Sequence, residues 1–335
     1  MKRTRSLLAL AAAAALSLTA CGSNSSDSSD GSDNASSGAN SDSYKIAVTQ
    51  IVTHASLDAS IEGFKAAIKD AGLDVTYDDQ NANNDQTVVA SIAGSIASGD
   101  YDLVLGVATP MAQGLAQSVK DVPILFTAVT DPVGSGLVDS LEAPGANITG
   151  TSDANPVEEQ IELIKEIDPD VKTVGVIYHS GEANSKVQVE WVKEAAAKLG
   201  IEVKEATVTN TSEVQQAANS LDVDAIYLPT DNTVISALDS VLQVGESKKI
   251  PVYPAEGDSV AKGGLATYGI SYYDLGYQTG EMAVRILVDG EDPATMPVET
   301  QQDLLVYVNL GAAERMGVTI PQAVLDRATP ETTTK

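Results

Sequence analysis

Four carboxylates in this chain stand where they can receive a positively charged group. Asp131, Asp231, Glu256 and Asp258 each follow closely on a short apolar run. A pocket for a zwitterion needs an anion facing the ammonium group and hydrogen-bond donors facing the acid. The sequence therefore indicates a binding site for an amino-acid-like ligand. An Asx turn or a helix cap is the alternative role of these residues, most strongly at Asp131, which precedes Pro132.

Donors for the acid group are expected at Ala108, Thr109 and Pro110. Proline is favoured in the first turn of a helix, so the segment predicts a helix that begins there. The free N–H groups of that turn and the Thr109 hydroxyl can receive a carboxylate at the positive end of the helix dipole. The alternative is that Thr109 only caps the helix.

Further polar and aromatic side chains follow other predicted strands, where they can contact a ligand, cap a helix or belong to the core. The polar candidates are Gln50, His54, Thr130, Asn155, Asn184, Ser185 and Thr230. The aromatic candidates, which can form the sides of a slot, are Phe126, Tyr178, Tyr268, Tyr272 and Tyr273.

Catalytic and metal-binding motifs are not found in the sequence. His54 and His179 are the only histidines, and without cysteine or ordered carboxylate spacing they give a weak metal signal. The chain has no Gly-x-Ser-x-Gly elbow, no phosphate-binding Gly-Lys-Thr/Ser loop and no His-Glu-x-x-His motif. We expect a binding protein without cofactor or metal, not an enzyme.

The elements that must position these side chains alternate between apolar strand-like runs and amphipathic helical patterns, which is typical of a parallel sheet covered on both faces. The second half repeats the order of the first at an offset of about 125 residues, which indicates two similar α/β lobes. The elements are expected at 45–49, 55–71, 74–77, 85–97, 102–106, 109–119 and 122–126, then 172–178, 185–199, 202–205, 212–221 and 224–231.

Two such lobes can face each other across one cleft, because ligands of open parallel sheets bind beyond the carboxyl ends of the strands. Asp231 ends the second-lobe strand that corresponds to the strand before Thr109. We therefore rank Asp231 first as the ammonium acceptor.

The N-terminal residues predict export and a lipid anchor. Basic residues at positions 2, 3 and 5 precede an apolar run over 7–18, and small residues lead to Cys21, the only cysteine. This order is typical of a lipoprotein signal peptide over 1–20 with lipidation at Cys21. Residues 21–43 are mostly Ser, Gly, Asn and Asp, which predicts a disordered tether. An uncleaved anchor is the alternative.

The formal net charge of −27 excludes nucleic acid as an expected partner and excludes anionic lipid bound through a basic patch. We expect a monomer held at the outer face of the cytoplasmic membrane by its lipid, in a periplasm or a cell-wall zone.

Several blocks of the chain together resemble the substrate-binding lipoproteins of ABC importers, in the tryptophan/tyrosine-binding family. The blocks are residues 49–59 (TQIVTHASLDA), 108–113 (ATPMAQ), 126–132 (FTAVTDP), 147–153 (NITGTSD), 174–178 (VGVIY), 181–185 (GEANS), 229–234 (PTDNTV) and 272–280 (YYDLGYQTG). Thr53 and Ser56 depart from the pattern of the first block.

The resemblance implies a type I periplasmic-binding-protein fold, with two Rossmann-like lobes joined by a hinge. It implies lobes of 44–151 plus 272–296 and of 152–271 plus 297–330. It also implies delivery of an aromatic amino acid to an ABC permease and its ATPase. The alternatives are a receptor for a branched-chain amino acid, nucleoside or sugar, a surface enzyme, and a structural or adhesive lipoprotein.

Overall fold

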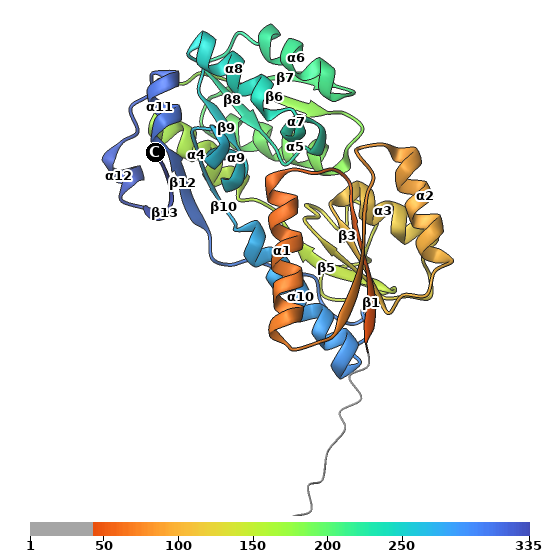
Figure 1. Cartoon of the computed structure of the whole chain (residues 1–335). Helices are drawn as coiled ribbons and strands as arrows, with labels where there is room; N and C mark the ends of the chain where they lie inside the picture. The colour runs from red at the N-terminus through yellow and green to blue at the C-terminus, as the bar shows by residue number, and fades with distance from the viewer. Residues whose placement is uncertain (1–42) are drawn as a thin grey trace, which may run out of the picture. The chain divides into compact units, whose positions relative to one another are not determined.

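The computed structural model describes residues 43–335 (Figure 1). The predicted signal peptide, Cys21 and nearly all of the tether lie outside the described residues. Within the part that is described, no helix is both long enough and apolar enough to cross a membrane.

The first lobe, as we use the term, is built on a six-stranded sheet in the order β11-β5-β4-β3-β1-β2. All of its paired strands are parallel. The strands are β1 (Tyr44–Gln50), β2 (Val75–Asn81), β3 (Leu103–Val107), β4 (Ile124–Thr127), β5 (Ile148–Ser152) and β11 (Glu299–Thr300).

The second lobe contains a parallel four-stranded sheet in the order β7-β6-β8-β9, which repeats the order β2-β1-β3-β4 of the first lobe. A three-stranded sheet in the order β10-β12-β13 completes this lobe, and its β10–β12 pair is antiparallel. The strands are β6 (Thr173–His179), β7 (Glu202–Val208), β8 (Ala225–Leu228), β9 (Val252–Pro254), β10 (Ala266–Gly269), β12 (Leu305–Asn309) and β13 (Ala328–Thr334).

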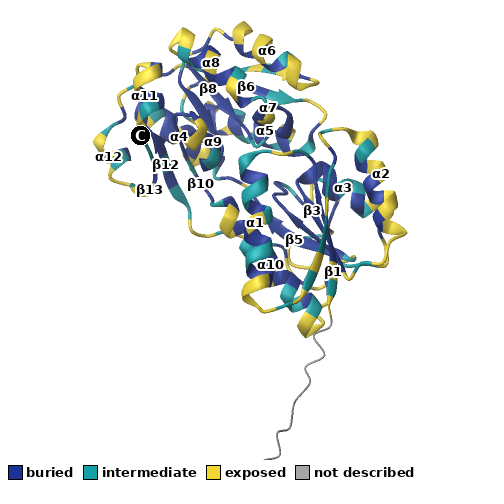
Figure 2. Ribbon diagram, viewed as in Figure 1, coloured by how far each residue is buried: buried dark blue, intermediate teal, exposed yellow. Residues whose placement is uncertain are grey.

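Helices cover the sheets, with α1 and α10 on one side of the first sheet and α2 and α3 on the other (Figure 1). The central strands are buried, whereas most residues of β2, β7 and β13 are half-buried or exposed, as are the outer faces of the helices (Figure 2). The helices are α1 (Ala55–Asp70), α2 (Gln86–Ala97), α3 (Thr109–Ser118), α4 (Val157–Ile167), α5 (Ala183–Lys198), α6 (Val214–Ser220), α7 (Asn232–Ser236), α8 (Leu238–Lys248), α9 (Gly257–Lys262), α10 (Tyr272–Val284), α11 (Leu310–Met316) and α12 (Gln322–Leu325), and a π-helical turn over Arg285–Asp289 extends α10.

The α/β class and the parallel sheets predicted from the sequence are confirmed. The lobe boundaries expected from the sequence stay a prediction, and near the last of them the chain remains with the first sheet for a few residues longer. Glu299 and Thr300 still pair with β5 of the first sheet, and the chain enters the second lobe with β12 at Leu305. Two paired residues give little signal in the sequence, because a run that short has no periodicity.

Helices α1 and α10 approach each other closely because glycines face the partner backbone. A Cβ atom added to Gly276 would lie 1.8 Å from the Ser60 carbonyl oxygen, and one added to Gly63 would lie 2.0 Å from the Tyr273 carbonyl oxygen. Neither contact can be relieved by a side-chain rotation, since the opposing atoms belong to the backbone.

We expect Gly276→Ala to lower the free energy of unfolding by about 1–3 kcal/mol, because α1 and α10 must move apart. Gly94 in α2 is the matched control, since a Cβ atom there meets nothing within 4 Å. Gly94→Ala should instead stabilise the helix by about 0.5–1 kcal/mol. Urea unfolding of the two variants tests the packing, and equal stability of both would contradict it.

Candidate functional site

A small cavity lies between the two lobes, at the carboxyl ends of their strands. Its volume is about 10 Å³, so the surrounding side chains nearly fill it. The lining residues come from both lobes and are His54, Leu57, Ala128, Asp153, Asn184, Thr230, Asn232, Ile235, Glu256 and Tyr272. The position is the one expected for a ligand of two facing parallel sheets.

Hydrogen bonds join the lobes around this cavity. The Asn84 side-chain amide of the first lobe donates to the Thr233 hydroxyl of the second, with 2.8 Å between Nδ2 and Oγ1. The hydroxyl oxygens of Thr130 and Thr230 lie 3.4 Å apart across the same gap. The structure therefore shows the two lobes in contact, with the cleft closed.

Asp153 is a buried carboxylate in the cavity wall, directly after β5, and only 2% of it is exposed. Its Oδ1 accepts from the Thr130 hydroxyl at 2.9 Å, and its Oδ2 accepts from the Tyr272 hydroxyl at 2.5 Å. Among residues 43–335 no salt bridge involves Asp153. Burial raises the pKa of this carboxyl. Since a carboxylate offers about four acceptor positions, Asp153 keeps room for further donors.

His54 presents a hydrogen-bond acceptor to the same cavity. Its ring is partly exposed as a whole, but the Nδ1 atom is buried without a partner. Burial lowers the pKa of His54 to about 4, so the ring is neutral near pH 7. The nearby Asn232 side chain, whose Nδ2 donates to Glu182, offsets part of this lowering of the pKa. Since Nδ1 is buried without a partner, we assign the proton of the neutral ring to Nε2, which leaves a lone pair on Nδ1.

Two asparagines repeat this pattern of unused acceptors. Asn184 lines the cavity and donates through Nδ2 to the Thr230 carbonyl, whereas its buried Oδ1 has no partner. Asn155, outside the cavity wall, donates to the Asp153 carbonyl, and its buried Oδ1 is likewise without a partner. The unused acceptors of His54 and Asn184 in the wall favour a ligand that brings donors.

Glu256 is the second carboxylate in the cavity wall, and only 2% of it is exposed. It caps α9, because its carboxylate accepts from the backbone N–H of Ser259 at 2.9 Å and from the Ser259 hydroxyl. Burial and the neighbouring charge of Asp258 raise the pKa of Glu256. Some of the acceptor positions of the Glu256 carboxylate are thus used to cap α9.

Asp231, ranked first from the sequence, is buried but does not line the cavity. Its carboxylate accepts from the His179 backbone N–H and the Ser185 hydroxyl, both at 2.6 Å, and from the Val234 backbone N–H at 2.8 Å. These donors make Asp231 the cap of α7. The cap role, which the sequence left open as the alternative, is the one that the structure shows.

Burial, followed by the charge of nearby Glu182, raises the pKa of Asp231 from 3.8 to about 7. The folded state thus holds a proton that the unfolded state releases, so stability should rise as the pH falls from about 8 to about 6.5, by at most about 1.4 kcal/mol per pH unit. Below about pH 6.5, His54 opposes this gain. Because its pKa is lowered in the folded state, the unfolded state binds a proton at this histidine at a higher pH than the folded state does.

Urea unfolding of the wild type and of Asp231→Asn at several pH values between about 6.5 and 8 measures this linkage. We expect the slope of stability against pH to flatten in the variant. The same slope in both proteins would show that Asp231 does not carry the proton.

The remaining predicted residues lie outside the cavity wall. Gln50 donates to Asp58 at 2.7 Å, Asp131 accepts from the Gly134 backbone N–H, and Tyr178 donates to Glu205 of β7. The other predicted residues outside the cavity wall lie close to the ends of strands; they are Ala108, Thr109, Thr130, Asn155, Ser185 and Asp231.

Thr109 is 1% exposed and begins α3 as predicted, and its buried hydroxyl has no partner. Ala108 before it has a φ of 76°, and Ala128 at the end of the neighbouring β4 has a φ of 58°. Strained backbone of this kind is often held at binding sites. The role of Thr109 as a carboxylate donor stays a prediction.

Asp153 was missed as a site residue by the reasoning from sequence, although it ends the block 147–153. A carboxylate after a predicted crossing between lobes was the available signal. Leu57, Ala128 and Ile235 gave no signal of their own, because apolar residues near strand ends are common in cores.

Residues 45–332 match the family described as ABC transporter substrate binding protein. The chain belongs to this family. The resemblance inferred from the sequence blocks is confirmed. Members bind a solute outside the cytoplasm for an ABC transporter, so this substrate-binding protein is extracytoplasmic.

Relatives of this substrate-binding protein include the tyrosine-binding protein of Clostridioides difficile, 42% identical over 79% of this chain and 78% of the relative. Its fold also matches a solved ABC domain in complex with L-Trp from Streptococcus pneumonia (40% identity, TM-score 0.83, 88% and 100% coverage). Type I periplasmic-binding-protein structures under 20% identical share the fold alone.

The arrangement of the lobes can be compared with a ligand-free, open structure of a substrate-binding protein with adhesive properties from Clostridium difficile. That chain is 43% identical, with 87% and 98% coverage, but its TM-score is 0.65. Its score is lower than that of the L-Trp complex, although its identity is no lower. The hydrogen bonds between the lobes of this substrate-binding protein are those of a closed form.

Proposed function

We propose that this protein captures an aromatic amino acid with a ring donor, tyrosine or tryptophan, and delivers it to an ABC permease and its ATPase. The observation that carries the proposal is the set of buried acceptors facing the cavity. Asp153 is an anion suited to the ligand ammonium, and Nδ1 of His54 is a lone pair suited to a phenol O–H or an indole N–H. The ligands named for two relatives support the same class.

Binding closes the protein because the ligand contacts both lobes. Asp153 and His54 follow strands of the first lobe, whereas Asn184 and Thr230 belong to the second. A ligand that bridges them stabilises the closed state by its greater affinity for that state. The cavity is narrow, so the ligand enters while the lobes are apart, and side chains in its wall adjust around the ring.

The ligand carboxylate is assigned to the N-terminus of α3. Thr109 supports this assignment with a buried hydroxyl that has no partner, at the positive end of a helix dipole. The lobes that move are those expected from the sequence, 44–151 plus 272–296 and 152–271 plus 297–330, except that Glu299 and Thr300, which pair with β5, move with the first lobe.

We further propose that the protein is a monomer anchored through lipid at Cys21, on the strength of the N-terminal sequence pattern. Cys21→Ala should move the protein from the membrane fraction to the soluble fraction of cells. Retention of the variant in the membrane would contradict lipidation at this residue.

Calorimetric titration tests the proposed function. The protein is unfolded and refolded to remove any carried ligand, then titrated with tyrosine, tryptophan, phenylalanine, leucine and a nucleoside. One-to-one binding of tyrosine or tryptophan is expected. Binding of leucine or the nucleoside alone would keep the family but overturn the aromatic ligand.

A further inference from the structure

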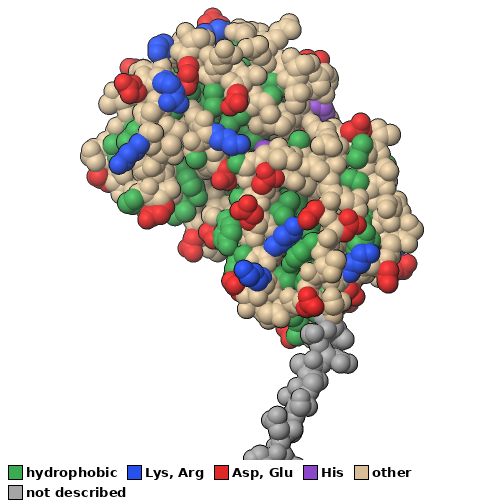
Figure 3. All heavy atoms as spheres, in the orientation of Figure 1, with side chains coloured by type: hydrophobic (Ala, Val, Ile, Leu, Met, Phe, Trp, Pro, Cys, Tyr) green, Lys and Arg blue, Asp and Glu red, His purple; other side chains and the backbone are tan. Residues whose placement is uncertain are grey.

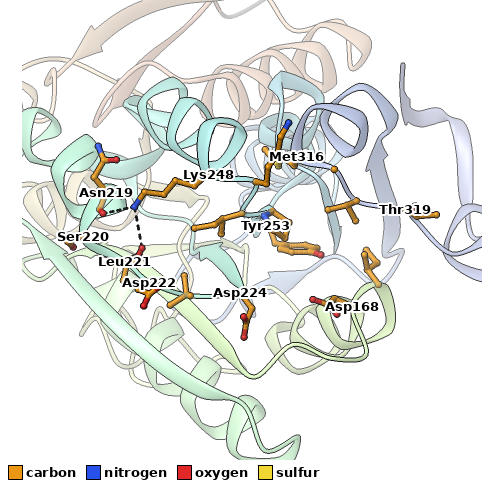
Figure 4. Close-up of a pocket in the computed structure, with 17 residues that line it drawn as sticks. Asp168, Asn219, Ser220, Leu221, Asp222, Asp224, Lys248, Tyr253, Met316 and Thr319 are labelled. Atoms are coloured by element: carbon orange, nitrogen blue, oxygen red, sulfur yellow. Dashed lines mark hydrogen bonds between the residues drawn. The ribbon is translucent and has the colours of Figure 1, made fainter.

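A second cavity lies at the base of the second lobe, at the amino-terminal ends of β8 and β9 and away from the cleft (Figure 4). Its volume is about 840 Å³. The wall is formed by segments that follow the helices α4, α6, α8 and α11. Neither lining residues nor elements are shared with the cavity between the lobes.

Tyr253 of β9 places a polar atom in this wall that has no partner. The residue is 2% exposed, and its hydroxyl oxygen is buried without a hydrogen bond. A buried hydroxyl that is left unpaired costs free energy, so it indicates a place for a bound group. Burial, with the charge of Asp168, raises the pKa of Tyr253, so the hydroxyl keeps its proton.

The electrostatics of the cavity favour a positive charge. Helices α4 and α8 end at its edge, and the carboxyl end of a helix carries partial negative charge. Three carboxylates also line the cavity, those of Asp168, Asp222 and Asp224.

The lysines of this wall are already engaged with backbone carbonyls. Lys248 donates to the Asn219 carbonyl at 2.6 Å, as Figure 4 shows, and Lys249 donates to the Arg315 carbonyl. Both ammonium groups are thus bound to carbonyls in the last turns of α6 and α11.

Of the three carboxylates, Asp168 is the one best placed to receive a ligand. Asp224 accepts from the backbone N–H groups of Lys172 and Thr173 and from the Thr173 hydroxyl, so it is occupied in the fold. The Asp168 carboxylate accepts only from the Asp170 backbone N–H among the hydrogen bonds of the described residues. Its charge also acts on the Tyr253 hydroxyl.

The wall is mixed: beside polar residues such as Asn219, Ser220 and Thr319, it carries apolar side chains, among them Ile167, Ile250, Met316 and Val318. An aliphatic chain can pack against these side chains. Residues 43–335 contain no group of three or more metal-ligating side chains suited to a metal ion. An organic cation therefore fits this cavity better than a metal ion.

We propose that the cavity at the base of the second lobe binds a small aliphatic amine. Its ammonium group donates to the Asp168 carboxylate and to the hydroxyl oxygen of Tyr253, and its carbon chain lies against the apolar side chains of the wall. This site is separate from the one that takes the transported solute, so the two ligands bind independently.

Titration with putrescine tests the proposal, with 1,4-butanediol as the uncharged probe of the same length. We expect the wild type to bind putrescine one-to-one and the diol at least tenfold more weakly. Tyr253→Phe removes only the hydroxyl and should weaken putrescine binding at least tenfold, as should Asp168→Asn, because each loses one hydrogen bond to a charged group.

Binding of tyrosine in the cleft shows whether a variant of the second cavity is correctly folded. Tyr253→Phe should bind tyrosine as the wild type does, and Asp153→Asn should bind putrescine as the wild type does. No putrescine binding at millimolar concentration, equal binding of the diol, or equal putrescine binding by wild type and Tyr253→Phe would overturn the proposal. None of these outcomes alters the expected binding of an amino acid in the cleft.

Discussion

Asp153→Asn should weaken binding of the amino acid about 100-fold or more. The carboxylate is buried between the Thr130 and Tyr272 hydroxyls, and no salt bridge among residues 43–335 involves it. An ammonium group bound there loses its counter-ion in the variant. Removing one partner of a buried charged pair costs about 2–5 kcal/mol. Titration of wild type and variant with tyrosine and tryptophan measures the loss.

The fold of Asp153→Asn should be intact, because asparagine has the same shape and can still accept from a hydroxyl. Burial raises the pKa of Asp153, so removal of its charge does not destabilise the unliganded protein. An unchanged or higher melting temperature would show this.

Glu256→Gln is the matched comparison, since Glu256 lines the same cavity but also caps α9. We expect it to weaken binding less than tenfold and to lower the melting temperature. If Glu256→Gln abolished binding while Asp153→Asn kept it, the ammonium group would belong to Glu256.

Phenylalanine should bind about 5- to 150-fold more weakly than tyrosine, because it leaves Nδ1 of His54 buried and unpaired. Such an unsatisfied acceptor costs about 1–3 kcal/mol. A site that is built to bond a ligand O–H or N–H discriminates against the analogue that lacks it. Parallel titrations with the two amino acids give the ratio directly.

His54→Leu should reduce the ratio of the two affinities toward one, since the leucine side chain has no acceptor that a ligand donor must satisfy. Asn184→Leu serves as the comparison, because the Oδ1 of Asn184 is also buried without a partner in the cavity wall. If only the Asn184 variant lost the discrimination, that amide would be the ring acceptor. Equal binding of phenylalanine and tyrosine by the wild type would exclude both assignments.

The acidic surface is consistent with a small neutral or zwitterionic ligand held inside the protein. In Figure 3, Asp and Glu side chains are spread over the visible face of both lobes. The formal charge of −27 favours solubility and says little about the cleft, where burial and hydrogen bonds decide the chemistry.

Local sequence patterns by themselves determined the α/β class, the repeated order of strands and helices along the chain and the start of α3 at Thr109. These features depend on residues close together in the chain, such as an apolar strand of five residues or a proline in the first turn. The family also followed from short blocks, and the polar ends of the strands located the cleft.

Only the tertiary structure decided which carboxylates line the cleft, namely Asp153 and Glu256 and not Asp231. Asp153 and Asp231 both follow strands, but Asp231 meets the donors of His179, Ser185 and Val234 and becomes a cap. Asp153 meets two hydroxyls, one of them Tyr272, 119 positions later in the chain. Local pattern carries no information on such distant partners. The cavity around Tyr253 has the same origin, because the ends of helices far apart in sequence converge there.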